Sequence, residues 1–341
     1  MDEEDMTGSK NLEESLRNKI MILNENAWDK RLTRYDIDRW LDNFTGRIVN
    51  KEKEKMVALF WLANFMYFGS KEVRALLRSL YRDVYMSTLA CQAEDYLPVS
   101  AGIKERQEFI DQQIDKTLFV SLGNPSESGA HLLYFFRQEN RITKRKFINA
   151  SELFNVEQSG YFFRFFGIKK NEIKLAHKEC LHYVFIDDLC GSGAQLLRYS
   201  DSVASLISEL SPQAKTYFFS LFGSKSGLDK ARSDGRFTYC ESIFEMDSSY
   251  RALSENSRYF HGLDGEISRK DVVDVVEGYG QLLDKTYATG WKDGQLFMGF
   301  SHNIPDNCPA FIWYDTSIAS AEEKDLDWVP IFKRYPKIYG S

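Results

Sequence analysis

The sequence has little of what marks secreted, membrane-spanning or zinc-binding proteins. Its 341 residues contain no Cys-x-x-Cys motif, and the five cysteines are scattered: Cys91, Cys180, Cys190, Cys240 and Cys308. Such spacing favours free thiols in a reducing compartment over a disulfide framework or a zinc site. No apolar run approaches the roughly 20 residues of a membrane span, and the acidic start MDEEDMTGSK has no signal-peptide pattern. We therefore expect a cytoplasmic protein with no membrane association.

The chain also lacks an excess of positive charge. Its net charge is −6 and its pI is about 5.6, so no overall basic field indicates nucleic-acid binding. The basic run 141–146 and the aromatic and cationic stretch 162–170 leave local nucleic-acid contact open. A hydrophobic content of 43%, with 25 Phe and 18 Tyr, excludes a disordered chain. The length suits one large domain or two small ones.

The most informative stretch is LHYVFIDDLCGSGAQLLRY, residues 181–199. Tyr183–Ile186 predicts a short buried strand closed by Asp187 and Asp188, and a glycine-containing loop then leads into a helix over 195–199. Backbone N–H groups at a helix start favour an anion. Two adjacent carboxylates resist joint ionisation unless hydroxyl donors or a cation share them. A ribose 5-phosphate fits both features, since its diol suits the acids and its phosphate suits the helix start.

This pattern resembles the phosphoribosyl-pyrophosphate (PRPP) loop of type I phosphoribosyltransferases, in which four apolar residues and two acids precede Thr-Gly-x-Thr. Here Ser192 and Gly193 stand in the Thr-Gly positions, while Gln195 replaces the last hydroxyl residue. The resemblance implies PRPP binding by seven residues: Asp187, Asp188, Gly191, Ser192, Gly193, Ala194 and Gln195. It also implies Mg²⁺ on the pyrophosphate, held by Asp187 and Asp188 only through the substrate. The alternative is that the acids and Ser192 cap an ordinary strand-to-helix turn.

The rest of the chain divides by pattern. Residues 1–34 indicate an acidic tail and a candidate docking helix, 35–115 a helical segment, and 116–341 an α/β domain. Repeated strand–loop–helix units predict a parallel sheet in the last part. Helical spacing and strand formers predict helices at 36–41, 51–68, 72–89, 130–138 and 271–283, and strands at 117–122, 183–186, 214–222, 236–241, 296–300 and 309–314.

A parallel sheet gathers its binding loops at the carboxyl ends of the strands. We therefore expect loops 123–129, 187–195 and 223–227 at one rim. Ser128 and Gly129 are candidates for holding pyrophosphate, and the alternative is an ordinary helix N-cap. The 223–227 loop does not fit the Walker pattern because its first glycine lies too close to its lysine, which excludes a nucleoside triphosphatase.

A second candidate group follows the strand at 296–300, in the turn Ser-His-Asn-Ile-Pro-Asp-Asn. His302 is a candidate catalytic acid or base near neutral pH, and with Asp187 and Asp188 it completes the set of candidate catalytic residues. Asn303 and Asn307 are candidates for binding a base edge or the acceptor. The alternative is turn chemistry, since Asn, Asp and Pro commonly form turns.

A wider resemblance joins these motifs. Trp40-Leu41, the 123–129 loop, the acid pair with its loop, the 302–307 turn and the closing Trp-x-Pro-x-Phe-x-Arg resemble divergent phosphoribosyltransferase-like effectors of bacterial conflict systems. Some members accompany retron reverse transcriptases in anti-phage defence. The resemblance implies a type I phosphoribosyltransferase-like α/β core with an N-terminal helical segment, and a toxic effector that transfers or hydrolyses a ribosyl phosphate. The alternative is a non-catalytic ribonucleotide-binding subunit of a complex with a reverse transcriptase and its nucleic acid.

Overall fold

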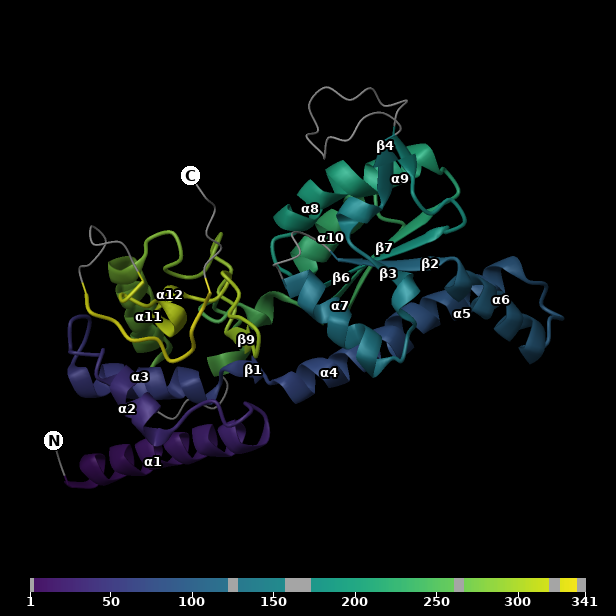
Figure 1. Ribbon diagram of the computed structural model, residues 1–341. Coiled ribbons are helices and arrows are strands. Elements are labelled where there is room, and N and C mark those ends of the chain that lie inside the picture. The colour runs from purple at the N-terminus through teal and green to yellow at the C-terminus, as the bar shows by residue number, and fades with distance from the viewer. Residues whose placement is uncertain (1–2, 122–127, 157–172, 261–266, 319–325, 336–341) are drawn as a thin grey trace. The chain divides into compact units, whose positions relative to one another are not determined.

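The chain forms two compact units in the computed structural model, which describes residues 3–121, 128–156, 173–260, 267–318 and 326–335 (Figure 1). The first unit combines residues 1–73 with 247–341, and the second is residues 74–246. The division falls once inside helix α4 (Ser70–Ser79) and once after strand β8 (Tyr239–Met246). These units do not coincide with the sequence-based division at 34/35 and 115/116, because the C-terminal part of the chain packs with the N-terminal helices.

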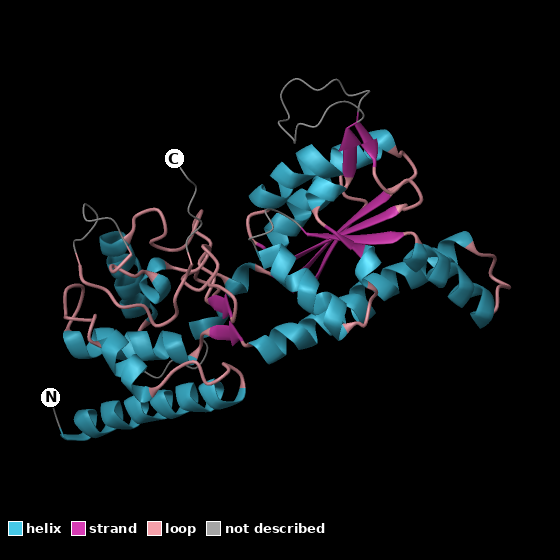
Figure 2. Cartoon of the chain, viewed as in Figure 1, coloured by secondary structure: helices cyan, strands magenta, loops and turns pink. Residues whose placement is uncertain are grey.

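The second unit holds a five-stranded parallel sheet, as the sequence predicted (Figure 2). Its strands, in spatial order, are β3 (Phe147–Ile148), β2 (Thr117–Ser121), β6 (His182–Cys190), β7 (Lys215–Ser224) and β8. The register places Val120 beside Phe185 and Phe185 beside Phe218. The central strands are apolar on both faces because helices cover both.

Each face of this sheet has its own set of helices, which are visible in Figure 1. Leu196, Ile207 and Leu228 of α8, α9 and α10 share a core with Tyr183 and Phe185 of β6. On the other face, aromatic rings of a π-helical segment and of α7 pack on Phe119 of β2. The helical elements of this unit include the π-helical segments Leu80–Tyr85 and Ser200–Ala204, α5 (Met86–Tyr96), α6 (Ile103–Asp115), α7 (Ser128–Glu139), α8 (Ala194–Tyr199), α9 (Ser205–Leu210) and α10 (Lys225–Asp234).

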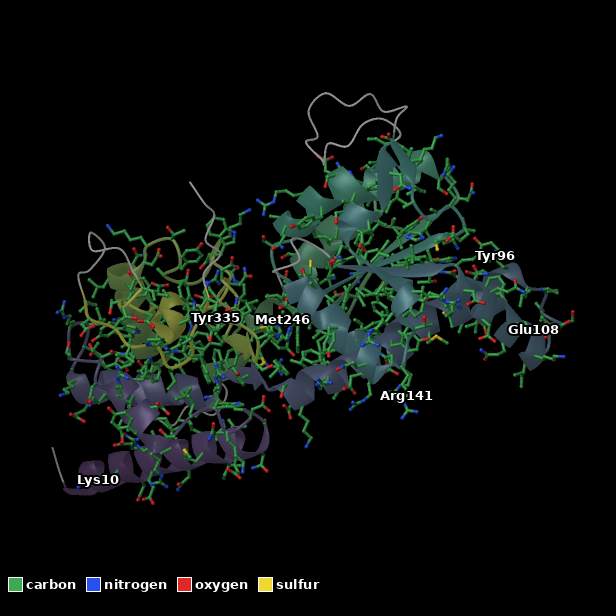
Figure 3. All side chains as sticks on the ribbon, in the orientation of Figure 1. Lys10, Tyr96, Glu108, Arg141, Met246 and Tyr335 are labelled. Carbon is green, nitrogen blue, oxygen red and sulfur yellow. The ribbon has the colours of Figure 1, made fainter. Side chains whose placement is uncertain are left out.

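Helices α5 and α6 pack on each other beyond the sheet, and Figure 3 labels Tyr96 at the end of α5 and Glu108 in α6. Tyr96 stacks on Phe109 with ring centroids 6.1 Å apart. Two short strands, β4 (Phe154–Val156) and β5 (Ile173–Leu175), pair antiparallel in the same unit. The aromatic and cationic stretch 162–170 and the loop residues 122–127 lie outside the described residues.

The first unit is built around an aromatic core. Its elements are α1 (Glu3–Asn26), α2 (Arg34–Leu41), α3 (Lys51–Ala63), β1 (Met66–Phe68), α11 (Arg269–Leu283), β9 (Met298–Phe300) and α12 (Ala310–Trp313). Strand β1 pairs in parallel with β9. The buried indoles of Trp40 and Trp328 both donate to the backbone oxygen of Phe311, at 3.3 and 3.1 Å. These two tryptophans, which belong to the sequence motifs, are therefore part of the core of the first unit.

Some elements of this unit differ from the sequence-based expectation. Helix α1 begins inside the expected acidic tail, and its apolar residues at four-residue spacing, Leu12, Leu16 and Ile20, pack on the core. The helix expected over 51–68 ends at Ala63, since the last three residues pair with β9. Residues 309–314, expected as a strand, contain the short helix α12. Among the described residues, no helix is long and apolar enough to span a membrane.

Candidate functional site

Both predicted carboxylates lie near the carboxyl end of β6, inside the strand rather than after it. The strand continues to Cys190 because Asp187 pairs with Ser220 of β7, and the last residue of β6 also pairs with β7. The Oδ1 atom of Asp187 accepts a hydrogen bond from the backbone N–H of Asp188 at 2.9 Å and one from the Ser128 hydroxyl at 3.3 Å. The structure therefore brings Ser128, at the start of α7 beside Gly129, to the acid pair.

The acid pair is electrostatically strained. Burial raises the pKa of Asp187 well above its usual range, and the charge of Asp188 raises it further. The Ser128 hydroxyl and the Asp188 N–H favour the ionised form but do not cancel these effects. A ligand that brings hydroxyl donors or positive charge to this point would relieve the repulsion between the two carboxyl groups.

A glycine turn, residues 191–193, connects β6 to α8. Gly193 has a φ of +72°, in the left-handed region that glycine adopts without strain. Its carbonyl accepts the N–H of Leu197 at 2.9 Å and so begins the helix. Ser192, Ala194 and Gln195 are half-buried around this helix start. The predicted order of strand, glycine turn and helix is present.

Residues 223–227, expected as a loop, are the end of β7 and the first turn of α10, and they lie against this glycine turn. The Ser224 hydroxyl donates to the backbone oxygen of Gly191 and accepts from the N–H of Gly227 at 3.0 Å. A Cβ atom on Gly227 would lie 2.2 Å from that same Gly191 oxygen, so a side chain there cannot be accommodated without movement of the turn. The structure thus brings residues 187–195, residues 223–227 and Ser128 together at one rim, although strand and helix ends, and not loops, form most of it.

Cys190 lies at the end of β6 but is not an activated nucleophile. Burial, together with the nearby carboxyl group of Asp187, raises the pKa of its thiol to about 12. The thiol is therefore protonated at neutral pH, whereas nucleophilic cysteines require a lowered pKa.

Sequence reasoning missed two serines on the strands that flank β6. Ser121 ends β2 beside Ile186, and Ser220 lies in β7 beside Asp187. Both hydroxyl groups are buried, and neither has a hydrogen-bond partner within the described part of the chain. The available signal was a single serine inside an otherwise apolar strand, in LFVSL and YFFSLF.

A polar network at the amino ends of the same strands was also missed. The ring of His182 lies between the Tyr217 hydroxyl, 2.6 Å from Nδ1, and the Gln113 side chain, 2.9 Å from Nε2. Burial, together with the positive charges of Lys215 and Lys116, lowers the pKa of His182 to about 4. This histidine is therefore neutral, and it lies at the end of the sheet opposite to the acid pair.

The 302–307 turn belongs to the first unit. Asn303 Oδ1 accepts the backbone N–H groups of Ile304 at 2.9 Å and Tyr335 at 3.0 Å. Asn307 is buried, and its backbone oxygen accepts the N–H of Leu296 at 3.0 Å. These contacts favour the turn-chemistry interpretation for both asparagines.

His302 stacks on Phe300, with ring centroids 5.2 Å apart. It lies in the first unit, whereas Asp187 and Asp188 lie in the second. A joint catalytic role for these three residues stays a prediction.

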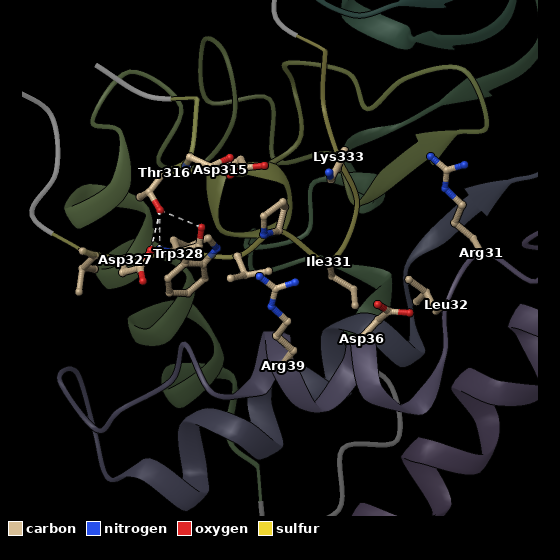
Figure 4. Close-up of a pocket in the computed structure, with 14 residues that line it drawn as sticks. Arg31, Leu32, Asp36, Arg39, Asp315, Thr316, Asp327, Trp328, Ile331 and Lys333 are labelled. Atoms are coloured by element: carbon tan, nitrogen blue, oxygen red, sulfur yellow. Dashed lines mark hydrogen bonds between the residues drawn. The ribbon is translucent and has the colours of Figure 1, made fainter. Parts of the chain in front are cut away.

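A cavity of about 720 Å³ lies within the first unit (Figure 4). Its lining carries both signs of charge, from Arg31, Arg39, Lys333, Asp36, Asp315 and Asp327. The Thr316 hydroxyl donates to Asp327 at 3.0 Å and accepts from the backbone N–H of Trp328 at 2.9 Å. All of the lining residues belong to the first unit, so this cavity does not include the acid pair.

Comparisons with known proteins give one family. Residues 37–334 match the sequence profile of the family described as PRTase-CE. No curated protein matches the chain. Among solved structures, it is similar to a Helicobacter pylori xanthine-guanine-hypoxanthine phosphoribosyltransferase, at 14% identity and a TM-score of 0.24, over 53% of this chain and 84% of that one. The assignment rests on the profile match, which covers most of both units: the chain belongs to the phosphoribosyltransferase-like PRTase-CE family.

Proposed function

We propose that the chain binds PRPP or a related ribosyl phosphate at the carboxyl end of β6 and transfers or hydrolyses it. The observation that carries this proposal is the acid pair at the end of β6, with the glycine turn and the start of α8 immediately after that strand. The ribose hydroxyls would donate to Asp187 and Asp188. The 5′-phosphate would accept from backbone N–H groups of residues 192–195. The family match supports this class of ligand.

The proposed chemistry breaks the bond between the anomeric carbon and the pyrophosphate. The sugar then has oxocarbenium character, and an acceptor or water attacks the anomeric carbon. The protein contributes mainly by orientation and electrostatics, since the acid pair fixes the ring and its negative charge lies near a cationic sugar. Ser128, which donates to Asp187, would help to hold that carboxyl group in place.

Magnesium suits this site as a partner of the substrate. Within the described ranges, no group of three or more His, Cys, Asp and Glu side chains could hold a metal ion. Two carboxylates supply too few oxygens for an ion that prefers six. Asp187 and Asp188 would therefore hold magnesium only together with oxygens of the substrate, and the ion would neutralise charge on the departing pyrophosphate.

Calorimetric titration of PRPP with Mg²⁺ tests the proposal. We expect the wild type to bind and the double variant Asp187→Ala/Asp188→Ala to bind about 100-fold more weakly, because two charged acceptors of the sugar hydroxyls are lost. The control is Asp315→Ala/Asp327→Ala, which removes the same charge from the cavity of the first unit. Absence of binding by the folded wild type, or equal binding by the acid-pair variant, would contradict the proposal.

We further propose that this site serves a toxic effector in anti-phage defence, in a complex with a reverse transcriptase and its nucleic acid. The support is the resemblance of the motifs. Copurification with nucleic acid would favour this role, and a monomer free of nucleic acid and of other proteins at high salt would count against it.

A non-catalytic ribonucleotide-binding subunit is the second candidate. It is favoured by Gln195, which occupies the position where the PRPP loop has a hydroxyl residue. The two candidates differ in turnover, so pyrophosphate release from PRPP discriminates between them. Binding without release, with nucleic acid and candidate acceptors supplied, favours the non-catalytic subunit.

A further inference from the structure

The hydroxyl of Ser224 forms hydrogen bonds to two different segments of the rim, and it also lies 3.4 Å from the Ser226 hydroxyl. As the N-cap of α10, its oxygen accepts the N–H of Gly227 at 3.0 Å. Its proton is directed to the backbone oxygen of Gly191. A carbonyl oxygen cannot donate, so the direction of this second bond is fixed. One hydroxyl group therefore satisfies a helix start and also holds the glycine turn that follows the acid pair.

Two glycines allow these segments to approach so closely. A Cβ atom on Gly227 would lie 2.2 Å from the Gly191 oxygen. A Cβ atom on Gly193, whose φ of +72° already disfavours other residues, would lie 2.9 Å from the Gly227 oxygen. The preceding strand ends are paired as well, Cys190 with Gly223. The position of the 191–193 turn is thus determined by the first turn of α10 as well as by its own residues.

A glycine turn needs such support if its N–H groups are to bind an anion. Gly191 and Gly193 give the turn wide backbone freedom, and each binding event would have to suppress it. A turn held in one conformation before the ligand arrives binds more tightly, because less conformational entropy is lost. Aspartate caps a helix as well as serine does, but an aspartate at position 224 would lack the proton that Gly191 accepts.

We infer that Ser224 is a positioning residue that fixes the glycine turn for binding of a phosphate group. This inference rests on the proposed function, since the phosphate in question is the 5′-phosphate of the ribosyl ligand. Ser224 acts through Gly191 and does not itself need to contact the ligand.

Two measurements on the full chain test this inference. The first is hydrogen exchange of the backbone amides of residues 191–196 without ligand, and the second is calorimetric titration with ribose 5-phosphate. In Ser224→Ala we expect exchange about tenfold faster and affinity about fivefold to tenfold weaker, as for the loss of one hydrogen bond. Ser224→Thr keeps the hydroxyl group, so its exchange rate and its affinity for ribose 5-phosphate should stay close to those of the wild type.

Matched controls separate positioning from helix capping and from charge. Ser268→Ala removes the serine N-cap of α11 in the first unit and should change neither readout. Ser224→Asp keeps a capping oxygen but no proton, and should resemble Ser224→Ala. Lys230→Asp places a negative charge on an exposed position of the same helix, away from Ser224, and measures the effect of charge on phosphate binding.

The outcomes distinguish this inference from the proposed function. If the wild type binds ribose 5-phosphate and Ser224→Ala binds it equally well, the positioning role is wrong and the proposed function stands. If the folded wild type binds neither ribose 5-phosphate nor PRPP with Mg²⁺, the proposed function fails, and hydrogen exchange of residues 191–196 alone tests whether Ser224 holds the turn. Unchanged exchange in Ser224→Ala overturns the inference in either case.

Discussion

Glu54 of the first unit and Asp187 of the second are both carboxyl groups surrounded by protein, but they differ in the hydrogen-bond donors that the chain offers them. Glu54 is fully buried and accepts four hydrogen bonds of 2.6 to 3.1 Å, from the backbone N–H groups of Gly46, Ile48 and Val49 and from the Tyr279 hydroxyl. Asp187 accepts one backbone N–H and a 3.3 Å bond from Ser128, and it lies beside Asp188. A carboxylate whose hydrogen-bonding capacity is filled by the chain's own donors stabilises the fold. A carboxylate with fewer donors among the described residues, beside a like charge, is suited to binding a ligand.

The strongest test of this comparison is Glu54→Ala. It leaves three N–H groups and a tyrosine hydroxyl without their shared acceptor, and we expect the free energy of unfolding to fall by about 3–5 kcal/mol. Chemical denaturation measures this loss. The control is Glu52→Ala, an exposed position on the same helix, with an expected change below about 0.5 kcal/mol. Equal losses in the two variants would show that the saturated carboxylate is not special.

His182 extends the comparison to the amino ends of the strands, where polar groups are paired. Its pKa of about 4 in the folded state lies below the ordinary 6.5, so the unfolded chain binds more protons between these values. Stability from this residue is therefore complete above pH 6.5 and is lost as the pH falls to 4, by about 3 kcal/mol. His182→Gln should make the free energy of unfolding less dependent on pH across this window, whereas the control His177→Gln should leave that dependence unchanged. An unchanged slope in His182→Gln contradicts this assignment.

The expected effect of Asp187→Asn on stability is opposite in sign to that of Glu54→Ala. Because the pKa of Asp187 is raised in the folded state, the folded chain binds its proton more tightly than the unfolded chain. Its contribution to stability is present below the unfolded pKa and is lost as the pH rises through the folded pKa. The melting temperature of Asp187→Asn relative to wild type should therefore rise from pH 4 to pH 8. A relative decrease would mean that the fold needs the carboxylate.

The sequence predicted the sheet of the second unit because strand–loop–helix units are local patterns. The strands expected at 117–122 and 214–222 lie within two residues of β2 and β7. The pairing of β1 with β9 joins segments far apart in the chain, and no local pattern could indicate it.

The candidate site divides in the same way. The acid pair and its glycine turn are contiguous and were found. The contact of Ser224 with Gly191 depends on how two strand ends lie side by side, so it could not be predicted from the sequence. Asn303 shows a further limit, since the side chains that stabilise a turn are also those that bind ligands.

The order of segments along the chain has a consequence for synthesis. The second unit is one continuous stretch, residues 74–246, whereas the first unit needs both β1 and β9. On the ribosome, the sheet that carries the acid pair can be completed before β9 has been made. Helices α1, α2 and α3 are made earlier, but the C-terminal segments on which they pack are made last. During that interval Trp61, fully buried in the finished protein, lacks Phe297, the ring on which it later stacks at 4.0 Å. The aromatic core of the first unit is therefore the part of the chain that stays incomplete longest during synthesis.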